Sequence, residues 1–351
     1  MSIRDDLLKR IDGRPVIVSI SGGKDSTACS LHLRELGIEH TLLHMSTGWE
    51  HPQTEEYLAA YLPSKLGPIT VLGGETMEER IVRLGAFPAR NRRWCTMELK
   101  IQRFVRFVDA LDDEPLVVIG IRHLESAKRA TMSEWDTHPS GVCDVWRPLV
   151  SWTVDDVVAI HHRHDVLPNP LYTRSHERVG CWPCINASKA EIRRMADDPI
   201  LPLAKRLQPL EESQQAIWTA KVNAMRHQAL GILHDGGTVE DAARALGKTR
   251  QIFPGQLKAA KDAEAHLKDG TPLDARPCPI AWFHAKGRGP MKVQDAISWS
   301  KTNRSKQFEM FASSKADRGC MRWGLCDTGA TAWDSPCDTP QANGAEEDVT
   351  G

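Results

Sequence analysis

A six-residue segment at positions 21–26, Ser-Gly-Gly-Lys-Asp-Ser, has the residue types that bind phosphate. Adjacent glycines let a backbone turn sharply and approach a ligand closely. Outward-facing backbone N–H groups, serine hydroxyls, the Lys24 ammonium and the positive end of a following helix would form a cradle for a di- or triphosphate. A Walker A loop is excluded, because Lys24 is followed by Asp25 and not by serine or threonine. A glycine-rich turn that binds nothing is the remaining alternative.

A second group of charged residues follows another short apolar run, in the segment Gly-Ile-Arg-His-Leu-Glu-Ser at positions 120–126. The guanidinium groups of Arg122 and Arg129 can each donate two hydrogen bonds to phosphate or sulfate oxygens. Glu125 can hold one of these groups in place. The pattern therefore predicts a second anion clamp, with a solvated helix start that contains Glu–Arg pairs as the alternative.

Four of the nine cysteines have spacing of interest: Cys181 and Cys184 form a C-x-x-C pair, and Cys95 and Cys143 lie far upstream. We expect their segments to end on the same side of a sheet, so that four thiolates converge. Two single cysteines followed by a C-x-x-C pair depart from the two-knuckle spacing of structural zinc, and are closer to the ligation of a [4Fe-4S] cluster. Zinc and thiols without a metal remain alternatives.

Two other sets of residues resemble metal ligands. His161, His162 and His164 have no carboxylate or cysteine at matching spacing, which favours a surface helix face over a metal site. The C-terminal half contains further cysteines without C-x-x-C spacing, for which scattered thiols are the simpler interpretation. These residues are Cys278, Cys320, Cys326 and Cys337, with His284 as a spare ligand.

The elements that must position these residues alternate between strands and helices. Short apolar runs at 15–20, 41–45, 69–72 and 116–121 predict strands, with helical patterns between them. This alternation predicts an α/β fold, a doubly wound and mostly parallel sheet with right-handed crossovers. Ligands bind at the carboxyl ends of such strands, so Thr47 and Gly48 are expected to line the same site as the phosphate loop.

The chain is expected to contain a first domain at 1–200 and a smaller, mainly helical domain at 201–337. Prolines at 199, 202 and 209 mark the boundary. Residues 238–261 resemble a helix-turn-helix, although an ordinary helical hairpin is favoured because Pro254 interrupts the second helix and the charge is balanced. The polar tail at 338–351 is predicted to be disordered.

Composition limits the classes of function. The chain has 351 residues and a formal net charge of -1, so no global basic field indicates nucleic acid, and such contacts would need a local patch. No stretch approaches the roughly 18 apolar residues of a membrane span. We therefore expect a cytoplasmic protein without a membrane partner, in which cysteines are ligands, reactive thiols or buried small residues.

Several motifs together resemble the phosphoadenosine-phosphosulfate (PAPS) reductase family of PP-loop (N-type) ATP pyrophosphatases, which split ATP between its α and β phosphates. Arg-Trp-Cys-Thr and Arg-Val-Gly-Cys-x-x-Cys are most similar to the branch with the sulfur-transfer ATPases of DNA phosphorothioation and their phage and plasmid relatives. The resemblance covers residues from about 14 to 195. The motifs occur in the family's order at 21–26, 47–50, 93–96 with 99–100, 120–122 with 125–126, 152–153, 169–172 and 178–184.

The resemblance implies an enzyme that uses ATP with Mg²⁺ to adenylate a substrate for sulfur transfer, releasing AMP and pyrophosphate. It also implies a persulfide-carrying donor protein. Nucleic acid is a candidate partner, and an oligomer is compatible with the sequence. Adenosine-phosphosulfate reductases hold a [4Fe-4S] cluster with an adjacent Cys-Cys pair and a distant C-x-x-C. Here Trp94 replaces one member of that pair, so Cys143 is expected to stand in.

Two alternatives remain open. One is a thioredoxin-linked reductase of PAPS or adenosine phosphosulfate. The reductases have a C-terminal Glu-Cys-Gly-[Leu/Ile]-His motif, and the only stretch that loosely resembles it is at 319–326, which counts against this alternative. The other is a nucleotide-sensing DNA-binding module. The predicted catalytic residues are Lys24, Asp25 and Arg122. The predicted nucleotide-binding residues are Ser19, Ser21, Gly22, Gly23, Lys24, Asp25, Ser26, Thr47, Gly48, Arg122, Glu125, Ser126 and Arg129.

Overall fold

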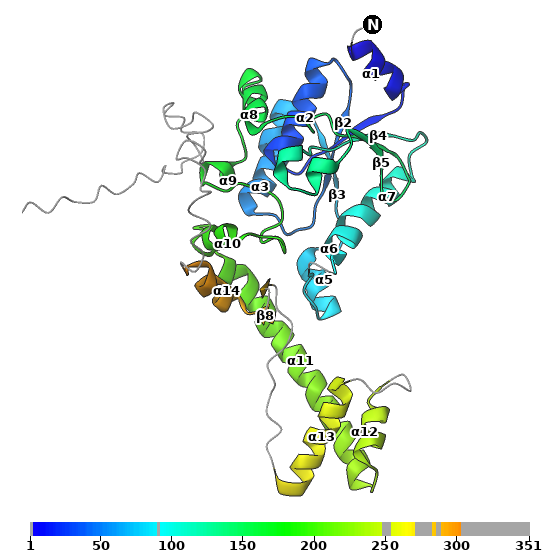
Figure 1. Cartoon of the computed structure of the whole chain (residues 1–351), viewed down its shortest axis with the longest axis vertical. Helices are drawn as coiled ribbons and strands as arrows, with labels where there is room; N and C mark the ends of the chain where they lie inside the picture. The colour runs from blue at the N-terminus through cyan, green and yellow to red at the C-terminus, as the bar shows by residue number, and fades with distance from the viewer. Residues whose placement is uncertain (1–2, 90–91, 248–253, 271–282, 286–288, 303–351) are drawn as a thin grey trace, which may run out of the picture. The chain divides into compact units, whose positions relative to one another are not determined.

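The computed structural model describes residues 3–89, 92–247, 254–270, 283–285 and 289–302 (Figure 1). They form two compact units. The first unit contains the described residues up to Thr76 together with 95–184, and the second contains 77–94 together with 185–302. The predicted disordered tail and the thiols of Cys278, Cys320, Cys326 and Cys337 lie outside the described residues.

The first unit is built on a six-stranded sheet in the order β3-β2-β1-β4-β6-β5. All neighbouring strands are parallel except β5, which runs antiparallel to β6 at one edge. The predicted doubly wound, mostly parallel sheet is therefore confirmed. Its strands are β1 (Val16–Ser19), β2 (Thr41–Met45), β3 (Ile69–Leu72), β4 (Leu116–Val118), β5 (Trp135–Thr137) and β6 (Asp144–Trp146).

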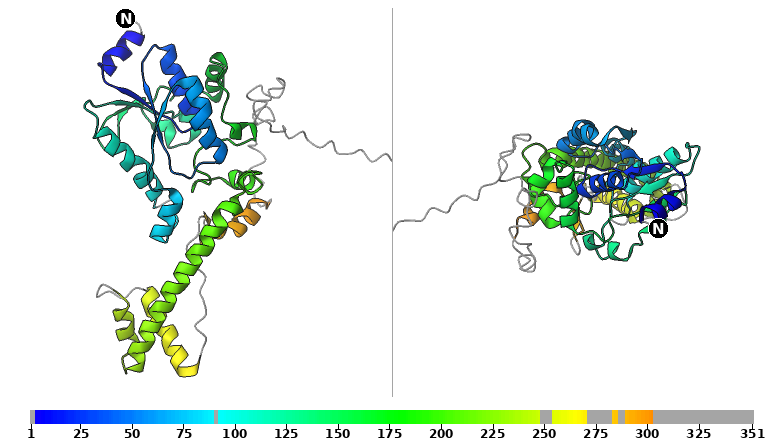
Figure 2. Two further views of the ribbon diagram at one scale, coloured as in Figure 1. Left: turned by 180° about the vertical axis from the view of Figure 1, so that it is seen from behind. Right: turned by 90° about the horizontal axis from the view of Figure 1, so that it is seen from above.

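Helices cover both faces of this sheet, as Figure 2 shows for α2 and α7. Val16 and Val18 of β1 pack into the core on one face with Leu31 of α2, while Ile17 packs on the other face with Phe104 of α7. This alternation is that of a strand buried on both sides. The helical elements are α1 (Ile3–Ile11), α2 (Lys24–Glu35), α3 (Pro52–Glu56), α4 (Leu62–Leu66), α6 (Trp94–Thr96), α7 (Gln102–Val108), α8 (Val154–Arg163) and α9 (Pro170–Thr173), with the π-helical turns η1 (Tyr57–Tyr61) and η2 (Met97–Ile101) and the 3₁₀ turns η3 (His123–Glu125) and η4 (Arg129–Thr131).

The second unit is mainly helical. Its α12 and α13 pack beside the C-terminal half of α11 (Figure 1), around small buried side chains that include Ala229, Ala243 and Ala263. Pro254 is the first residue of α13 and does not interrupt it, because proline is tolerated in the first turn of a helix. The elements are α5 (Met77–Leu84), α10 (Lys189–Ala196), α11 (Leu203–His234), α12 (Val239–Ala245), α13 (Pro254–Asp269), α14 (Val293–Ser300) and the strands β7 (Phe283–Ala285) and β8 (Gly289–Met291).

The compact units divide after Cys184, earlier than the predicted domain boundary at residue 200. The physical reason is that α10 belongs with the later helices: the Arg193 Nε on α10 donates to the Ser300 carbonyl of α14 at 2.9 Å. The α5 segment also belongs there, since Gln214 of α11 donates to the Ile81 carbonyl at 3.3 Å. None of the described helices has the length and the apolar run that a membrane crossing needs.

Candidate functional site

The predicted phosphate loop, residues 21–26, joins β1 to α2 at the point where the sheet order reverses, since β2 lies on one side of β1 and β4 on the other. Ligands of open α/β sheets bind at this position. Gly22 has a φ of +73°, a region that favours glycine, and a Cβ there would lie 3.2 Å from both Thr54 and Leu58. Gly23 has a φ of −88° and a ψ of 155° and starts α2 as its N-cap. The loop therefore places the N-terminus of α2 at the carboxyl edge of the sheet.

The two loop serines have different roles. Ser26 is buried, and its hydroxyl accepts the Ser21 backbone N–H at 3.2 Å and donates to the Gly23 carbonyl at 2.9 Å. Ser26 thus closes the loop from inside. Ser21 is exposed, and its hydroxyl lies 3.4 Å from that of Ser26. Ser19, the last residue of β1, is half-buried and pairs with Leu43 of β2.

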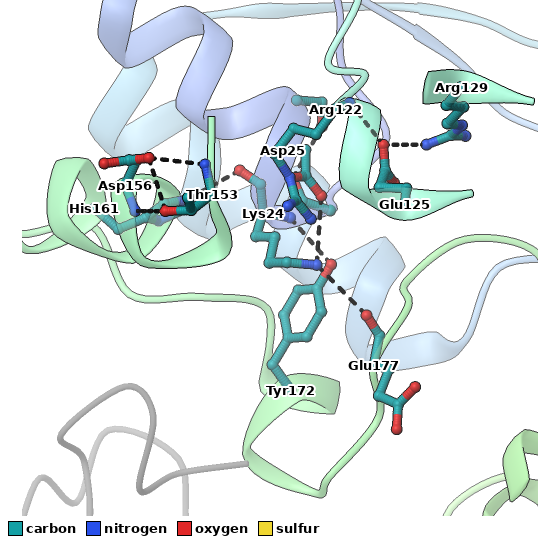
Figure 3. Close-up of polar contacts among 12 residues, drawn as sticks. Lys24, Asp25, Arg122, Glu125, Arg129, Thr153, Asp156, His161, Tyr172 and Glu177 are labelled. Carbon is teal, nitrogen blue, oxygen red and sulfur yellow. Dashed lines mark hydrogen bonds and ion pairs between the residues drawn. The ribbon is translucent and has the colours of Figure 1, made fainter. Parts of the chain in front are cut away.

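The three predicted catalytic residues lie together (Figure 3). The Lys24 ammonium is 3.4 Å from the Asp25 carboxylate, and Asp25 also forms an ion pair with the Arg122 guanidinium. Burial lowers the pKa of Lys24, but the nearby Tyr172 and Asp25 outweigh it, so that the pKa of Lys24 is raised. Lys24 therefore keeps its positive charge. Two cations flank one carboxylate, and this arrangement favours an arriving anion.

Arg122 reaches the loop because the chain after β4 passes very close to α2. A Cβ on Gly120 would lie 2.7 Å from the Asp25 carbonyl carbon and oxygen and 2.8 Å from the Ser26 nitrogen, closer than real side chains approach. Arg122 is only 3% exposed, with its guanidinium on Asp25. Only glycine at position 120 allows this approach. The sequence motif contained Gly120, but its steric role depends on a neighbour far away in the chain.

The rest of the predicted clamp is organised around Glu125. Its carboxylate accepts the backbone N–H of Arg122 at 2.8 Å and forms an ion pair with Arg129. The Ser126 hydroxyl accepts the Arg129 backbone N–H at 3.3 Å. Glu125 thus holds the Arg129 guanidinium, while Asp25 holds Arg122. The predicted residues are close neighbours, although the two arginines have different carboxylate partners.

Two side chains from distant segments hold the main chain of Lys24. The Tyr172 hydroxyl of α9 accepts the Lys24 backbone N–H at 3.1 Å. On α8, the His161 Nε2 lies 3.0 Å from the Lys24 carbonyl oxygen, and its Nδ1 lies 3.1 Å from the Val166 carbonyl oxygen. Burial lowers the pKa of His161. Neither contact was predicted from the sequence.

The interpretation of the α8 histidines as a surface face is wrong for His161, which is 1% exposed. Val157, on the same face one turn earlier, is fully buried, and this spacing was the available signal. His164 does lie near the surface, where its Nε2 is 3.0 Å from the Glu35 carboxylate.

The loop after β2 is held by a buried carboxylate. Glu50 accepts hydrogen bonds from the Thr47 hydroxyl at 2.8 Å and from the backbone N–H groups of Thr47 at 3.3 Å and Trp49 at 3.0 Å. Gly48 has a φ of +60°, and a Cβ there would lie 2.7 Å from Thr76. The Thr47 side chain, 1% exposed, therefore bonds within its own loop. Glu50 was part of a sequence motif, but this role was not predicted.

The same loop is joined to the C-x-x-C segment. Glu50 and Cys181 form an isolated antiparallel β-bridge, and the Trp182 N–H donates to the Trp49 carbonyl at 2.7 Å. The Trp49 indole N–H donates to the Pro183 carbonyl at 3.0 Å. These contacts fix the position of the cysteine pair relative to the loop that follows β2.

Three of the four predicted metal ligands, Cys95, Cys181 and Cys184, interact electrostatically with the Lys100 ammonium. Cys181 raises the pKa of Lys100 by more than burial lowers it. Burial raises the pKa of Cys181, against the opposing effect of Lys100. Lys100 therefore stays protonated and positively charged beside the three thiols.

Cys143 does not join them. It packs into the apolar core with Ile17 and Val117, and its thiol lies near Glu114, Asp144 and Arg14. Burial raises the pKa of this thiol to about 11. The expectation that all four segments end on one side of the sheet was mistaken, because Cys143 precedes β6 and so lies at the amino edge of the parallel strands. Among the residues that the structure describes, no three His, Cys, Asp or Glu side chains are arranged to hold a metal ion. The predicted four-cysteine cluster therefore does not fit.

A family model of the phosphoadenosine phosphosulfate reductase domain matches residues 15–187. The chain belongs to this family. An uncharacterized 37.8 kDa protein of Escherichia phage 186 is 33% identical, over 50% of this chain and 68% of the phage protein, in keeping with the predicted phage-like branch. An adenosine 5'-phosphosulfate reductase of Burkholderia cepacia is 33% identical, over 27% of this chain and 37% of that enzyme. Among solved structures, a PAPS reductase of Candida auris in a phosphate complex gives a TM-score of 0.42 at 18% identity, covering 52% of this chain and 90% of that one.

Proposed function

We propose that this protein is a PP-loop enzyme that activates a substrate by adenylation for sulfur transfer. In the reaction, a substrate oxygen attacks the α-phosphate of ATP, the bond between the α-phosphorus and the bridging oxygen breaks, and pyrophosphate leaves. A sulfur nucleophile then displaces AMP from the adenylated substrate. Membership in the PAPS reductase domain family supports a nucleotide substrate.

The observation that carries the proposal is the charge arrangement at the phosphate loop. Lys24 and Arg122 flank Asp25 beside the N-terminus of α2. Positive charge already in place stabilises the negative charge that develops on a leaving pyrophosphate, without further reorganisation. Mg²⁺ bound to the phosphates of ATP would supply additional charge stabilisation. In this proposal the Lys24 ammonium moves from Asp25 to the phosphate oxygens.

Sulfur transfer is supported by the thiols around Lys100. Cys95, Cys181 and Cys184 lie near this cation, and Cys181 is bridged to the loop after β2. A partner protein carrying a persulfide is the proposed sulfur source. Its outer sulfur displaces AMP while it is still bonded to the donor cysteine, and a second thiol then attacks the sulfur of the donor cysteine, which releases the thiolated substrate and leaves a disulfide. Sulfur modification of nucleic acid is a candidate for the overall process. No step of the proposal passes through an iron–sulfur cluster or zinc, because the four predicted cysteine ligands do not converge.

A second candidate is reduction of PAPS or adenosine phosphosulfate, and the identity with the Burkholderia cepacia reductase favours it. That similarity covers 27% of this chain, and the reductase would need an accessible thiol that attacks the sulfate sulfur. The nearest sequence candidate, Cys320, lies outside the described residues.

Incubation of the pure protein with α-labelled ATP and Mg²⁺ tests the first candidate, and release of sulfite from PAPS or adenosine phosphosulfate tests the second. We expect AMP and pyrophosphate from the wild type and at least a hundredfold loss in Lys24→Met, on the scale typical of a removed transition-state contact. Lys65→Met is the matched control, because Lys65 pairs with Asp165 at 3.2 Å, apart from the phosphate loop. Sulfite without AMP would favour the reductase.

A further inference from the structure

We propose that Tyr172 is a positioning residue of the phosphate loop, through which the segment 167–172 holds Lys24 in the conformation that receives phosphate. The inference rests on the proposed function, because it takes residues 21–26 as the phosphate site. It goes beyond that function by assigning a role to a side chain in a different element, α9.

Tyr172 contacts Lys24 in two ways (Figure 3). Its hydroxyl accepts the Lys24 backbone N–H at 3.1 Å, and the Lys24 ammonium lies 4.9 Å from the centre of its ring. The hydroxyls of Tyr172 and Ser21 each lie 3.4 Å from the position that a Cβ on Gly23 would take. Tyr172 is only 5% exposed. One buried side chain therefore touches the backbone and the charged end of the loop lysine.

The segment that carries Tyr172 is itself held by hydrogen bonds. The Tyr57 hydroxyl donates to the Leu167 carbonyl at 2.6 Å, and the Leu167 N–H donates to the Tyr61 hydroxyl at 2.7 Å. Two residues later, the Asn169 amide donates to the Thr54 hydroxyl at 3.2 Å. Because both the N–H and the C=O of Leu167 are hydrogen-bonded, moving this segment would break both bonds.

The two tyrosines that hold Leu167 form the ends of the π-helical turn η1. Their rings stack, with centroids 5.2 Å apart and an interplanar angle of 18°. Such turns are rare and often occur at functional sites. The same run of helix supports the phosphate loop directly, since Thr54 and Leu58 border Gly22. The run from 52 to 61 thus meets the loop at Gly22 itself and, through Tyr172, at Lys24.

This arrangement has two consequences for a bound phosphate. The Lys24 N–H is already satisfied by Tyr172, so the phosphate oxygens would use the other N–H groups of the loop. The ring holds the Lys24 ammonium beside the loop, which lowers the conformational entropy that a lysine side chain loses when it binds a ligand. Removing Tyr172 should therefore weaken the binding of phosphate-containing ligands while the sheet stays folded.

The test compares Tyr172→Phe, which keeps the ring, with Tyr172→Leu, which removes both contacts. By calorimetry, we expect the affinity for inorganic pyrophosphate to fall about three- to tenfold in Tyr172→Phe, as for one lost hydrogen bond, and further in Tyr172→Leu. Thr173→Val is the matched control on α9, because the Thr173 hydroxyl only donates to the Pro170 carbonyl, at 2.7 Å. We expect its pyrophosphate affinity to match that of the wild type.

Amide hydrogen exchange supplies a readout that a general loss of stability would not produce. We expect the Lys24 amide to exchange faster in Tyr172→Phe, while the Thr27 amide, bonded to the Gly23 carbonyl at 3.2 Å, keeps its rate. Wild-type exchange at Lys24 and wild-type pyrophosphate affinity in Tyr172→Phe would overturn the inference. A wild type that binds neither pyrophosphate nor ATP would instead overturn the proposed function, while the exchange rates would still report on the contact between Tyr172 and Lys24.

Discussion

The imidazole of His161 joins two carbonyl oxygens, that of Lys24 at 3.0 Å and that of Val166 at 3.1 Å. A neutral ring has one N–H, so only one of these carbonyls receives a hydrogen bond at a time. Val166 lies in the loop after α8, just before the segment that carries Tyr172. His161 thus connects the phosphate loop to that segment through the Lys24 carbonyl, whereas the Tyr172 hydroxyl binds the Lys24 N–H.

The first prediction concerns this connection. His161→Phe removes both polar contacts of the ring in a position that is 1% exposed, so the buried hydrogen bond to one of the two carbonyl oxygens is lost. We expect the free energy of unfolding to fall by about 1–3 kcal/mol, as for a buried polar group that loses its hydrogen bond. Urea unfolding measures this. His162→Phe is a suitable control because His162 is exposed on the same helix, and a similar loss in both variants would contradict the assignment.

The second prediction concerns pH. Burial lowers the pKa of five histidines in the first unit below the ordinary value of 6.5, and these are His32, His40, His44, His138 and His161. Near this pH the unfolded chain therefore binds more protons than the folded chain. The sign follows from linkage: stability is fully present above 6.5 and falls as the pH drops toward the lowered pKa values.

Amide exchange of β1 and β4, measured between about pH 7.5 and pH 5.5 and corrected for intrinsic rates, checks this direction. We expect less protection at the lower pH, and a smaller pH effect in His161→Phe. Protection that rises on acidification would contradict the prediction.

The third prediction uses the close approach of Gly120. Gly120→Ala places a Cβ 2.7 Å from the Asp25 backbone, so either α2 or the loop after β4 must shift. We expect a loss of about 1–3 kcal/mol in stability, as for overpacking in a core, together with weaker nucleotide binding because Arg122 moves away from Asp25. Gly73→Ala is the control, since nothing lies within 4 Å of its Cβ position and its φ is not in the positive region. Equal melting temperatures for the two variants would contradict this account.

The fourth prediction separates folding from binding at Gly23. Its φ of −88° is open to any residue, and a Cβ there makes ordinary contacts at 3.4 Å with the hydroxyls of Ser21 and Tyr172. Gly23→Ala should therefore fold like the wild type. The added methyl group would fill space between two hydroxyls at the phosphate site, so we expect at least a tenfold loss of pyrophosphate affinity, and a complete loss in Gly23→Val. Wild-type affinity in a folded Gly23→Val variant would show that phosphate binds elsewhere.

Local patterns in the sequence were enough to predict β1 to β4 and the turn from β1 into α2 at the carboxyl edge of the sheet, but they did not predict the short strands β5 and β6. Contacts between distant segments were not predicted either, because a spacing pattern within one element does not say what lies opposite it. Tyr172 belonged to a motif that had no assigned role, and His161 was taken for a surface residue. The error at Cys143 has a simple cause: a residue that precedes a parallel strand lies at the edge opposite to one that follows it. The strand at 144–146 was not among the predicted strands, so the position of Cys143 directly before it could not be used to remove this residue from the predicted ligands.

The fifth prediction follows from the separation of Cys143 from the other thiols. If the anaerobically purified protein holds iron or zinc through its cysteines, Cys143→Ala should leave the metal content unchanged, because this side chain lies at the amino edge of the sheet, in the core with Ile17 and Val117. Cys181→Ala, near Lys100 and the other two thiols, should lower the content. Metal analysis of both variants, together with the absorption spectrum, measures the difference. Cys143→Ala should instead affect stability, by about 1 kcal/mol for a small buried apolar group. Loss of metal from a folded Cys143→Ala variant would show that the four thiols do converge when metal is bound, and that β6 moves on binding.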